Sequence, residues 1–186
     1  MIDLQKAFIN YCLEEKFQIN ENQKKTISLL TKFHKDSKSS LSNFFRLFNK
    51  SQKLAFYLNG DVGVGKTMIL DFFYKSLNET KQRFHFNEFM IKFHDFRHIN
   101  KNKNEEYSIE AFVSELKKNS KIIYLDEFQV TNIVDAMILG KLFEVIFKKN
   151  IKIFISSNIK INDLYKDGLQ REQFLPFISI ITKYSL

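Results

Sequence analysis

The chain has 186 residues, a formal net charge of +8 and 44% hydrophobic residues, which together predict one globular domain with a sizeable core. The sequence has no apolar run of the roughly 20 residues that a membrane-spanning helix needs. Its start, MIDLQKAFIN, lacks the charged and apolar regions of a secretory signal. The single cysteine, Cys12, cannot form an internal disulfide, and this favours a cytoplasmic location.

The positive charge has two interpretations. A basic face would suit nucleic acid. However, the lysines are scattered along the chain. The composition is also the one expected from an AT-rich genome, because Lys, Asn, Ile and Phe are abundant while Gly, Pro and Trp are scarce. We therefore favour a compositional origin of the charge and do not expect nucleic acid as the partner.

Two helices are predicted at the N-terminus, where apolar residues recur at helical spacing from Leu4 to Phe17 and from Ile27 to Phe33. The polar stretch HKDSKSSLSN is a predicted loop, and a short Phe-rich helix around Phe44 follows it. We expect residues 1–50 to form an N-terminal helical segment and residues 51–186 to form the core.

Four segments rich in β-branched and aromatic residues are predicted strands: KLAFYLN, QRFHFN, KIIYLDE and IKIFISSN. Stretches with helical periodicity, such as VTNIVDAMILGKLFEVIFKKN, separate them. Strands that alternate with helices need crossover connections, so the predicted fold class is α/β, a parallel sheet flanked by helices. The polar stretch Asn100–Ser108 is predicted to be a mobile surface loop.

Three of the five glycines lie in LNGDVGVGKTMIL, which contains GDVGVGKT and so matches the P-loop pattern GxxxxGK[ST]. Backbone amides that point inward along a tight loop can wrap a phosphate, and that backbone needs dihedral angles which a Cβ atom obstructs. Lys66 would reach the β- and γ-phosphates of ATP, and the Thr67 hydroxyl would bind Mg²⁺. The predicted nucleotide-binding residues are Gly60, Asp61, Val62, Gly63, Val64, Gly65, Lys66, Thr67 and Met68.

Two carboxylates end the apolar strand in IIYLDEF. Asp126 would share the Mg²⁺ site with Thr67, and Glu127 would deprotonate the attacking water. The alternative is an ordinary acidic strand end. The pair favours an ATPase with its own catalytic base, and the guanine-reading NKxD motif is absent. Asn158, at the end of the fourth strand, would contact the γ-phosphate and the lytic water, or else only cap the strand.

Four blocks, in order from about residue 54 to residue 178, resemble the ZapE family of bacterial cell-division ATPases and their mitochondrial relatives, the AFG-one-like ATPases. The blocks are GDVGVGKTMILDFFY, RFHFNEFM, YLDEFQVTNIVDAMIL, and SSN followed by DLYKDGLQREQFLPFI. The resemblance implies an AAA+ homo-oligomer that hydrolyses ATP with Mg²⁺ to act on protein clients, division-ring components among them, with peripheral association at the inner membrane. Val64, Asn87 and Ile159 depart from the Arg, His and Pro that the family usually has there.

The same resemblance implies an arginine finger that reaches the γ-phosphate of a neighbouring subunit. Arg171, in GLQREQF, lies after Asn158 in the zone where such enzymes carry the finger, and Arg83 is the second choice. The alternative for Arg171 is a surface arginine at a helix start.

An AAA+ sheet has one more core strand than the four found here, and it carries a helical lid. The missing strand is expected to pair beside LAFYLN, which would otherwise be an uncovered edge. We therefore expect a truncated ATPase of low activity. Two rival functions stay open: a helicase-loader-like AAA+ ATPase that acts at nucleic acid, and an ATP-binding module without hydrolysis.

Overall fold

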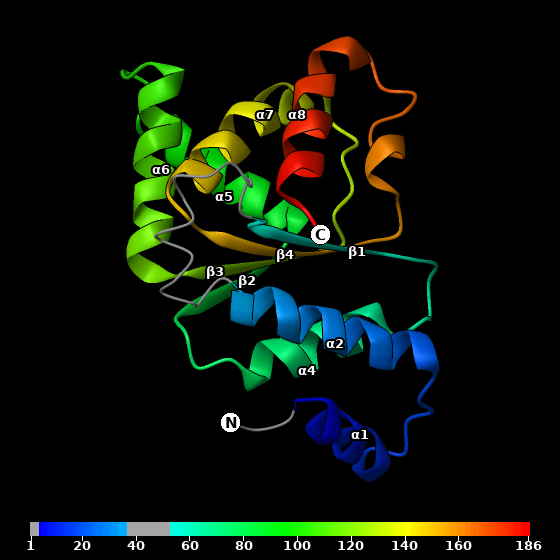
Figure 1. The fold of residues 1–186 in the computed structure, drawn as a ribbon. Coiled ribbons are helices and arrows are strands. Elements are labelled where there is room, and N and C mark those ends of the chain that lie inside the picture. Colours follow the sequence, from blue (N-terminus) through cyan, green and yellow to red (C-terminus); the bar gives the residue numbers. More distant parts are fainter. Residues whose placement is uncertain (1–3, 37–52) are drawn as a thin grey trace.

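A computed structural model describes residues 4–36 and 53–186, and its centre is a parallel sheet (Figure 1). The strand order is β1-β4-β3-β2, and every strand pair is parallel. The α/β prediction and its four strands are therefore confirmed, while the predicted Phe-rich helix around Phe44 lies outside the described residues. The strands are β1 (Ala55–Asn59), β2 (Lys81–His85), β3 (Ile122–Asp126) and β4 (Lys152–Ser157).

Helices cover both faces of this sheet (Figure 1). One face carries α1 (Leu4–Glu14), α2 (Glu21–Asp36) and α4 (Lys66–Ser76). The opposite face carries α5 (Phe86–Ile99), α6 (Glu105–Asn119), α7 (Ile133–Lys148) and α8 (Arg171–Tyr184), and the short 3-10 helix η1 (Ile161–Asp163) precedes α8. None of the helices within the described ranges combines the length and hydrophobicity needed to cross a bilayer.

Side chains of β3 alternate between two hydrophobic cores. Ile123 and Leu125 pack in the core beneath α5, α6, α7 and α8, whereas Ile122 and Tyr124 pack in the core beneath α1, α2 and α4. Successive strand residues point to opposite faces, and both faces are covered. This explains why β3 is a continuous apolar run up to Asp126.

The last residues of the chain lie along β1. Ser185 forms a parallel bridge with Ala55, and the Leu186 amide donates to the Ala55 carbonyl at 2.9 Å. The Leu186 carbonyl accepts from the Tyr57 amide at 3.0 Å. The expectation that β1 is an uncovered edge is therefore wrong over this stretch, because an extended segment after α8 satisfies its backbone groups. The pairing lies on the edge where a further strand was expected.

The predicted loop at Asn100–Ser108 is shorter than expected, because α6 begins inside it at Glu105. The Asn104 side chain accepts a hydrogen bond from the Tyr107 amide at 2.8 Å. Glu105 and Glu106 lie in the first helical turn, where negative charge complements the helix dipole. An Asn followed by two acids is a helix start signal that outweighs the polarity of the stretch.

We expect Asn104→Ala to lower the free energy of unfolding by about 1 kcal/mol, because it removes the side-chain acceptor at the α6 N-terminus. Urea unfolding followed by circular dichroism measures this change. Lys101→Ala, in the exposed loop before the cap, is the matched control and should stay within about 0.5 kcal/mol of the parent. Equal stability of Asn104→Ala and the control would contradict the capping role.

Candidate nucleotide site

The ends of two strands, β3 and β4, and the loop after β1 line a pocket of about 300 Å³ at the carboxyl edge of the sheet. β4 lies between β1 and β3, so parallel pairing brings these strand ends together. Gly60, Asp61 and Val64 of the predicted nucleotide-binding set do not line the pocket. The lining residues are Val62, Gly63, Gly65, Lys66, Thr67, Met68, Asp126, Glu127, Ser156, Ser157 and Asn158.

Two glycines have the backbone conformation that the loop requires. Gly63 has φ +83° and Gly65 has φ +85°, in the left-handed region that side-chain-bearing residues avoid. Gly65 is also the N-cap of α4, whose N-terminus therefore faces the pocket. At Gly60 the constraint is one of space, because an added Cβ would lie 3.3 Å from Cγ2 of Val64.

The Lys66 ammonium is held by its own loop. Its Nζ donates to the carbonyl oxygens of Gly60 and Asp61, at 2.7 Å each. The positive charge is therefore fixed across the loop, where an anionic ligand would meet it. These two carbonyls are neutral, so they are weaker partners for an ammonium than negatively charged phosphate oxygens would be.

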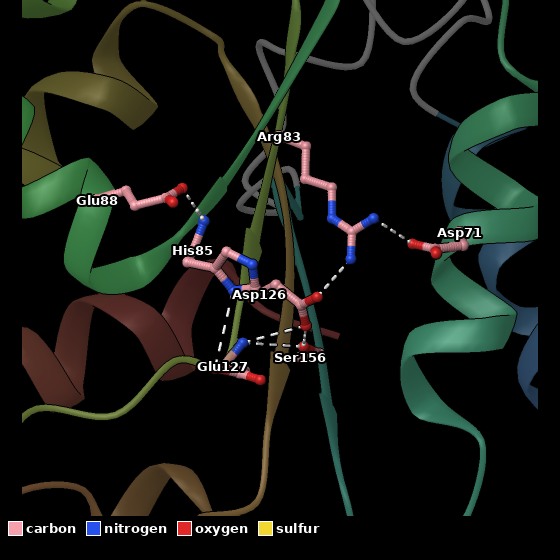
Figure 2. Close-up of polar contacts among 7 residues, drawn as sticks. All are labelled: Asp71, Arg83, His85, Glu88, Asp126, Glu127 and Ser156. Atoms are coloured by element: carbon pink, nitrogen blue, oxygen red, sulfur yellow. Dashed lines mark hydrogen bonds and ion pairs between the residues drawn. The ribbon is translucent and has the colours of Figure 1, made fainter.

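Asp126, at the end of β3, is buried, and hydrogen-bond donors contact both of its carboxylate oxygens (Figure 2). Oδ1 accepts from the Ser156 hydroxyl of β4 and from the Glu127 amide at 3.1 Å. Oδ2 accepts from Nη2 of Arg83, on β2, at 2.6 Å. Burial alone raises the pKa of Asp126, but the hydrogen bonds from Ser156 and Arg83 outweigh it and hold the pKa below its ordinary value. The carboxylate is therefore ionised at neutral pH.

Glu127 has a strained backbone and an exposed side chain. Its φ is +52°, in the left-handed region, and its side chain is 78% exposed beside the pocket. The Glu127 amide donates to Asp126 and also to the Ser156 hydroxyl at 3.3 Å. His85 Nδ1 lies 3.8 Å from the Glu127 carboxylate (Figure 2). Such strain persists only where the surroundings enforce it, and it is concentrated at functional sites.

The sequence marks Ser156, Ser157 and Asn158 as the polar end of β4, but only Asn158 was assigned a role in the site. Ser156 bonds Asp126, and its carbonyl accepts from the Phe128 amide at 2.8 Å. The Ser157 hydroxyl donates to the Phe128 carbonyl at 2.6 Å, and the Ser157 carbonyl accepts from the Gly60 amide at 3.3 Å. The sequence signal for these contacts is a pair of small hydroxyl residues at the end of an apolar strand.

Gln23 of α2 was also missed. Its Nε2 donates to the Val64 carbonyl of the P-loop at 3.4 Å, and a Cβ on Gly65 would lie 2.8 Å from this Nε2. Asn20 and Gln23 cap each other's backbone amides, at 2.9 and 3.0 Å, which is the reciprocal pattern of a capping box. Helix α2 therefore contacts the P-loop directly.

The two candidate finger arginines are both engaged within the chain. Arg171 Nη2 donates to the Asn162 carbonyl at 2.7 Å, and its Nε donates to the Tyr165 carbonyl at 3.2 Å. These contacts fix the segment between η1 and α8, outside the residues that line the pocket. Arg83 binds Asp126 of its own chain. A finger acts on a neighbouring subunit, so the role of Arg171 stays a prediction.

The donor set fits Mg²⁺. The Thr67 hydroxyl and the Asp126 carboxylate line the same pocket and offer the oxygen ligands that Mg²⁺ prefers. Within the described residues, no cluster of three or more His, Cys, Asp or Glu side chains could hold a metal by itself. Proteins usually bind Mg²⁺ through one or two side chains together with phosphate oxygens and water.

Removing the side chain of Glu127 should relieve backbone strain. We expect Glu127→Gly to be at least as stable as the parent, and by up to about 1 kcal/mol more stable, because glycine adopts positive φ without steric cost. Thermal unfolding measures this difference. Glu115→Gly, in the interior of α6, is the contrasting control and should be destabilised by about 1 kcal/mol. If Glu127→Gly is destabilised as much as Glu115→Gly, the backbone at position 127 is not strained.

Comparison with solved structures shows the AAA+ P-loop fold. The DnaC helicase loader matches with a TM-score of 0.55 at 14% identity, covering 91% of this chain and 90% of that chain. AMPPCP-bound DnaA from Aquifex aeolicus matches with a TM-score of 0.53 at 18% identity, covering 89% of this chain and 47% of that chain.

Sequence comparison identifies closer relatives. Cell division protein ZapE of Escherichia coli is 39% identical over 129 residues, which are 69% of this chain and 34% of ZapE. Lactation elevated protein 1 homolog B of Danio rerio is 41% identical over 141 residues, which are 69% of this chain and 28% of that protein. The matched part is thus about a third of the length of these relatives. The AFG1-like ATPase family model matches residues 4–185, which confirms the predicted resemblance. The chain belongs to the AFG1-like ATPase family.

Proposed function

We propose that this chain binds ATP with Mg²⁺ at the carboxyl edge of its sheet and hydrolyses it. The observation that carries the proposal is one pocket that brings together the P-loop, Asp126 and Glu127. Family membership supports the ATPase class. A binding module without hydrolysis is the weaker alternative, because the exposed carboxylate of Glu127 lies at the pocket where a catalytic base is needed.

The phosphates would be held by the P-loop and the start of α4. Backbone amides around Gly63 and Gly65 and the N-terminus of α4 present partial positive charge to an anion. Lys66 would exchange its two loop carbonyls for phosphate oxygens. Thr67 and Asp126 would hold Mg²⁺, which offsets phosphate charge in phosphoryl transfer.

Glu127 would accept the proton of the attacking water as general base. Its backbone amide donates to Asp126 and Ser156, so these bonds fix the point from which the Glu127 side chain extends, next to the proposed metal ligand Asp126. Asn158 lines the pocket at the end of β4 and would orient the water and the γ-phosphate. Arg171 would act on the nucleotide of a neighbouring subunit in a homo-oligomer.

The proposal for the partners is supported by a relative and by the family resemblance. The name of the Escherichia coli relative links it to cell division. We therefore propose protein clients, division-ring components among them, and peripheral association with the inner membrane. The matches to helicase loaders are below 20% identity and concern the fold alone, so action at nucleic acid is not adopted.

We expect Lys66→Ala to weaken ATP binding by at least about tenfold, because it removes charge-assisted hydrogen bonds to phosphate. Equilibrium dialysis or calorimetry measures the affinity. Lys160→Ala removes an exposed lysine outside the pocket and should leave the affinity unchanged. Equal ATP affinity of Lys66→Ala and the parent would overturn the phosphate assignment.

We expect Glu127→Gln to keep ATP affinity while turnover falls by about 10²–10⁴-fold, the usual contribution of a positioned base. Phosphate release under saturating ATP measures turnover. Glu115→Gln, an equal charge change on the exposed face of α6, should have no effect. If Glu127→Gln hydrolyses ATP at the parent rate, Glu127 is not the general base.

A further inference from the structure

One guanidinium joins two carboxylates from different elements. Arg83 Nη2 lies 2.6 Å from Oδ2 of Asp126, and its Nη1 lies 2.8 Å from Oδ1 of Asp71 on α4 (Figure 2). The guanidinium carbon also lies 4.8 Å from the ring centroid of Tyr124, on the same sheet face. Arg83 thus bridges the end of β3 to the helix that follows the P-loop.

The two carboxylates differ in their surroundings. The Asp126 side chain is 3% exposed, whereas the Asp71 side chain is 28% exposed. Without Arg83, the buried carboxylate would lack an opposite charge, which is costly for a desolvated ion. Asp71 is closer to solvent and has less need of a counter-charge. Arg83 is not among the residues that line the nucleotide pocket, and it reaches Asp126 from the side of α4.

We infer that Arg83 is the counter-cation that competes with Mg²⁺ for Asp126, and that Asp71 retains the guanidinium when the metal is bound. The inference rests on the proposed function in taking Asp126 as a metal ligand. Arg83 is a positioning residue in this account, since it acts through Asp126. Asp71 and Thr67 belong to the same helix, so the exchange couples metal occupancy to α4.

The electrostatics set the direction of the effect. A positive charge in direct contact with Oδ2 lowers the affinity of the carboxylate for any second cation. Asp71 offsets part of that charge and gives Arg83 another partner. Removal of Asp71 should therefore strengthen the hold of Arg83 on Asp126, while neutralisation of Arg83 should free the carboxylate for metal. A purely structural ion pair predicts the opposite for Arg83, because a loosened Asp126 would bind metal less well.

The test is calorimetric titration of Mg²⁺ at pH 8 into protein loaded with a non-hydrolysable ATP analogue, with Mn²⁺ electron paramagnetic resonance as a second measurement. We expect Asp71→Asn to weaken metal binding and Arg83→Gln to tighten it, each by about tenfold, a common scale for the effect of one neighbouring charge on a carboxylate. Glu144→Gln and Arg97→Gln make the same charge changes on α7 and α5 and should leave metal affinity unchanged.

Weaker metal binding by Arg83→Gln, or unchanged binding by Asp71→Asn, would overturn the inference. If Arg83→Gln does not fold, Asp71→Asn still decides, because it keeps the Arg83–Asp126 pair intact. The affinity for the analogue in EDTA separates loss of nucleotide from loss of metal. If the parent protein does not bind the analogue in a metal-dependent way, the proposed function itself is refuted. If the parent binds the metal and the analogue, and both variants have the same metal affinity as the parent, only the role of Arg83 is refuted.

Discussion

The buried charge of Asp126 is the constraint on which the site depends. A carboxylate so little exposed to water is stable as an ion only when both oxygens receive hydrogen bonds. The donors come from β2, from β4 and from the residue that follows β3. Satisfying this one group therefore fixes three neighbouring strand ends relative to one another, and it sets the backbone of Glu127 in its strained conformation.

The parallel sheet makes this convergence possible. Because all strands run in one direction, the P-loop after β1, the acids after β3 and the serines of β4 meet at one edge. Helix α2 adds a contact from the outside, through Gln23 and the Val64 carbonyl. The phosphate loop is thus supported both by the sheet and by a helix that precedes it in the chain.

Local patterns predicted the parts of the molecule that local physics determines. The P-loop could be found because glycine, lysine and threonine must occur at fixed spacing. The central strands β3 and β4 could be found because burial on both faces demands apolar runs. Asp126 and Glu127 were found because they end such a run. The α6 start was missed because the polarity of its surroundings hid the cap at Asn104.

Contacts across the sheet could not be predicted in the same way. The partnership of Arg83 with Asp126 depends on strand order, and the four strand sequences do not specify their order. Ser156 contacts Asp126 only because β4 lies beside β3. The pairing of Ser185 and Leu186 with β1 likewise depends on where α8 ends in space, which helical periodicity alone does not determine.

A crystal structure with Mg²⁺ and a non-hydrolysable ATP analogue would test whether the pocket at the carboxyl edge of the sheet holds Mg²⁺ and ATP. We expect the triphosphate inside the P-loop, with Lys66 Nζ moved from the Gly60 and Asp61 carbonyls to phosphate oxygens. We expect the metal near Thr67 and Asp126. An analogue bound elsewhere, with the Lys66 contacts unchanged, would contradict this expectation.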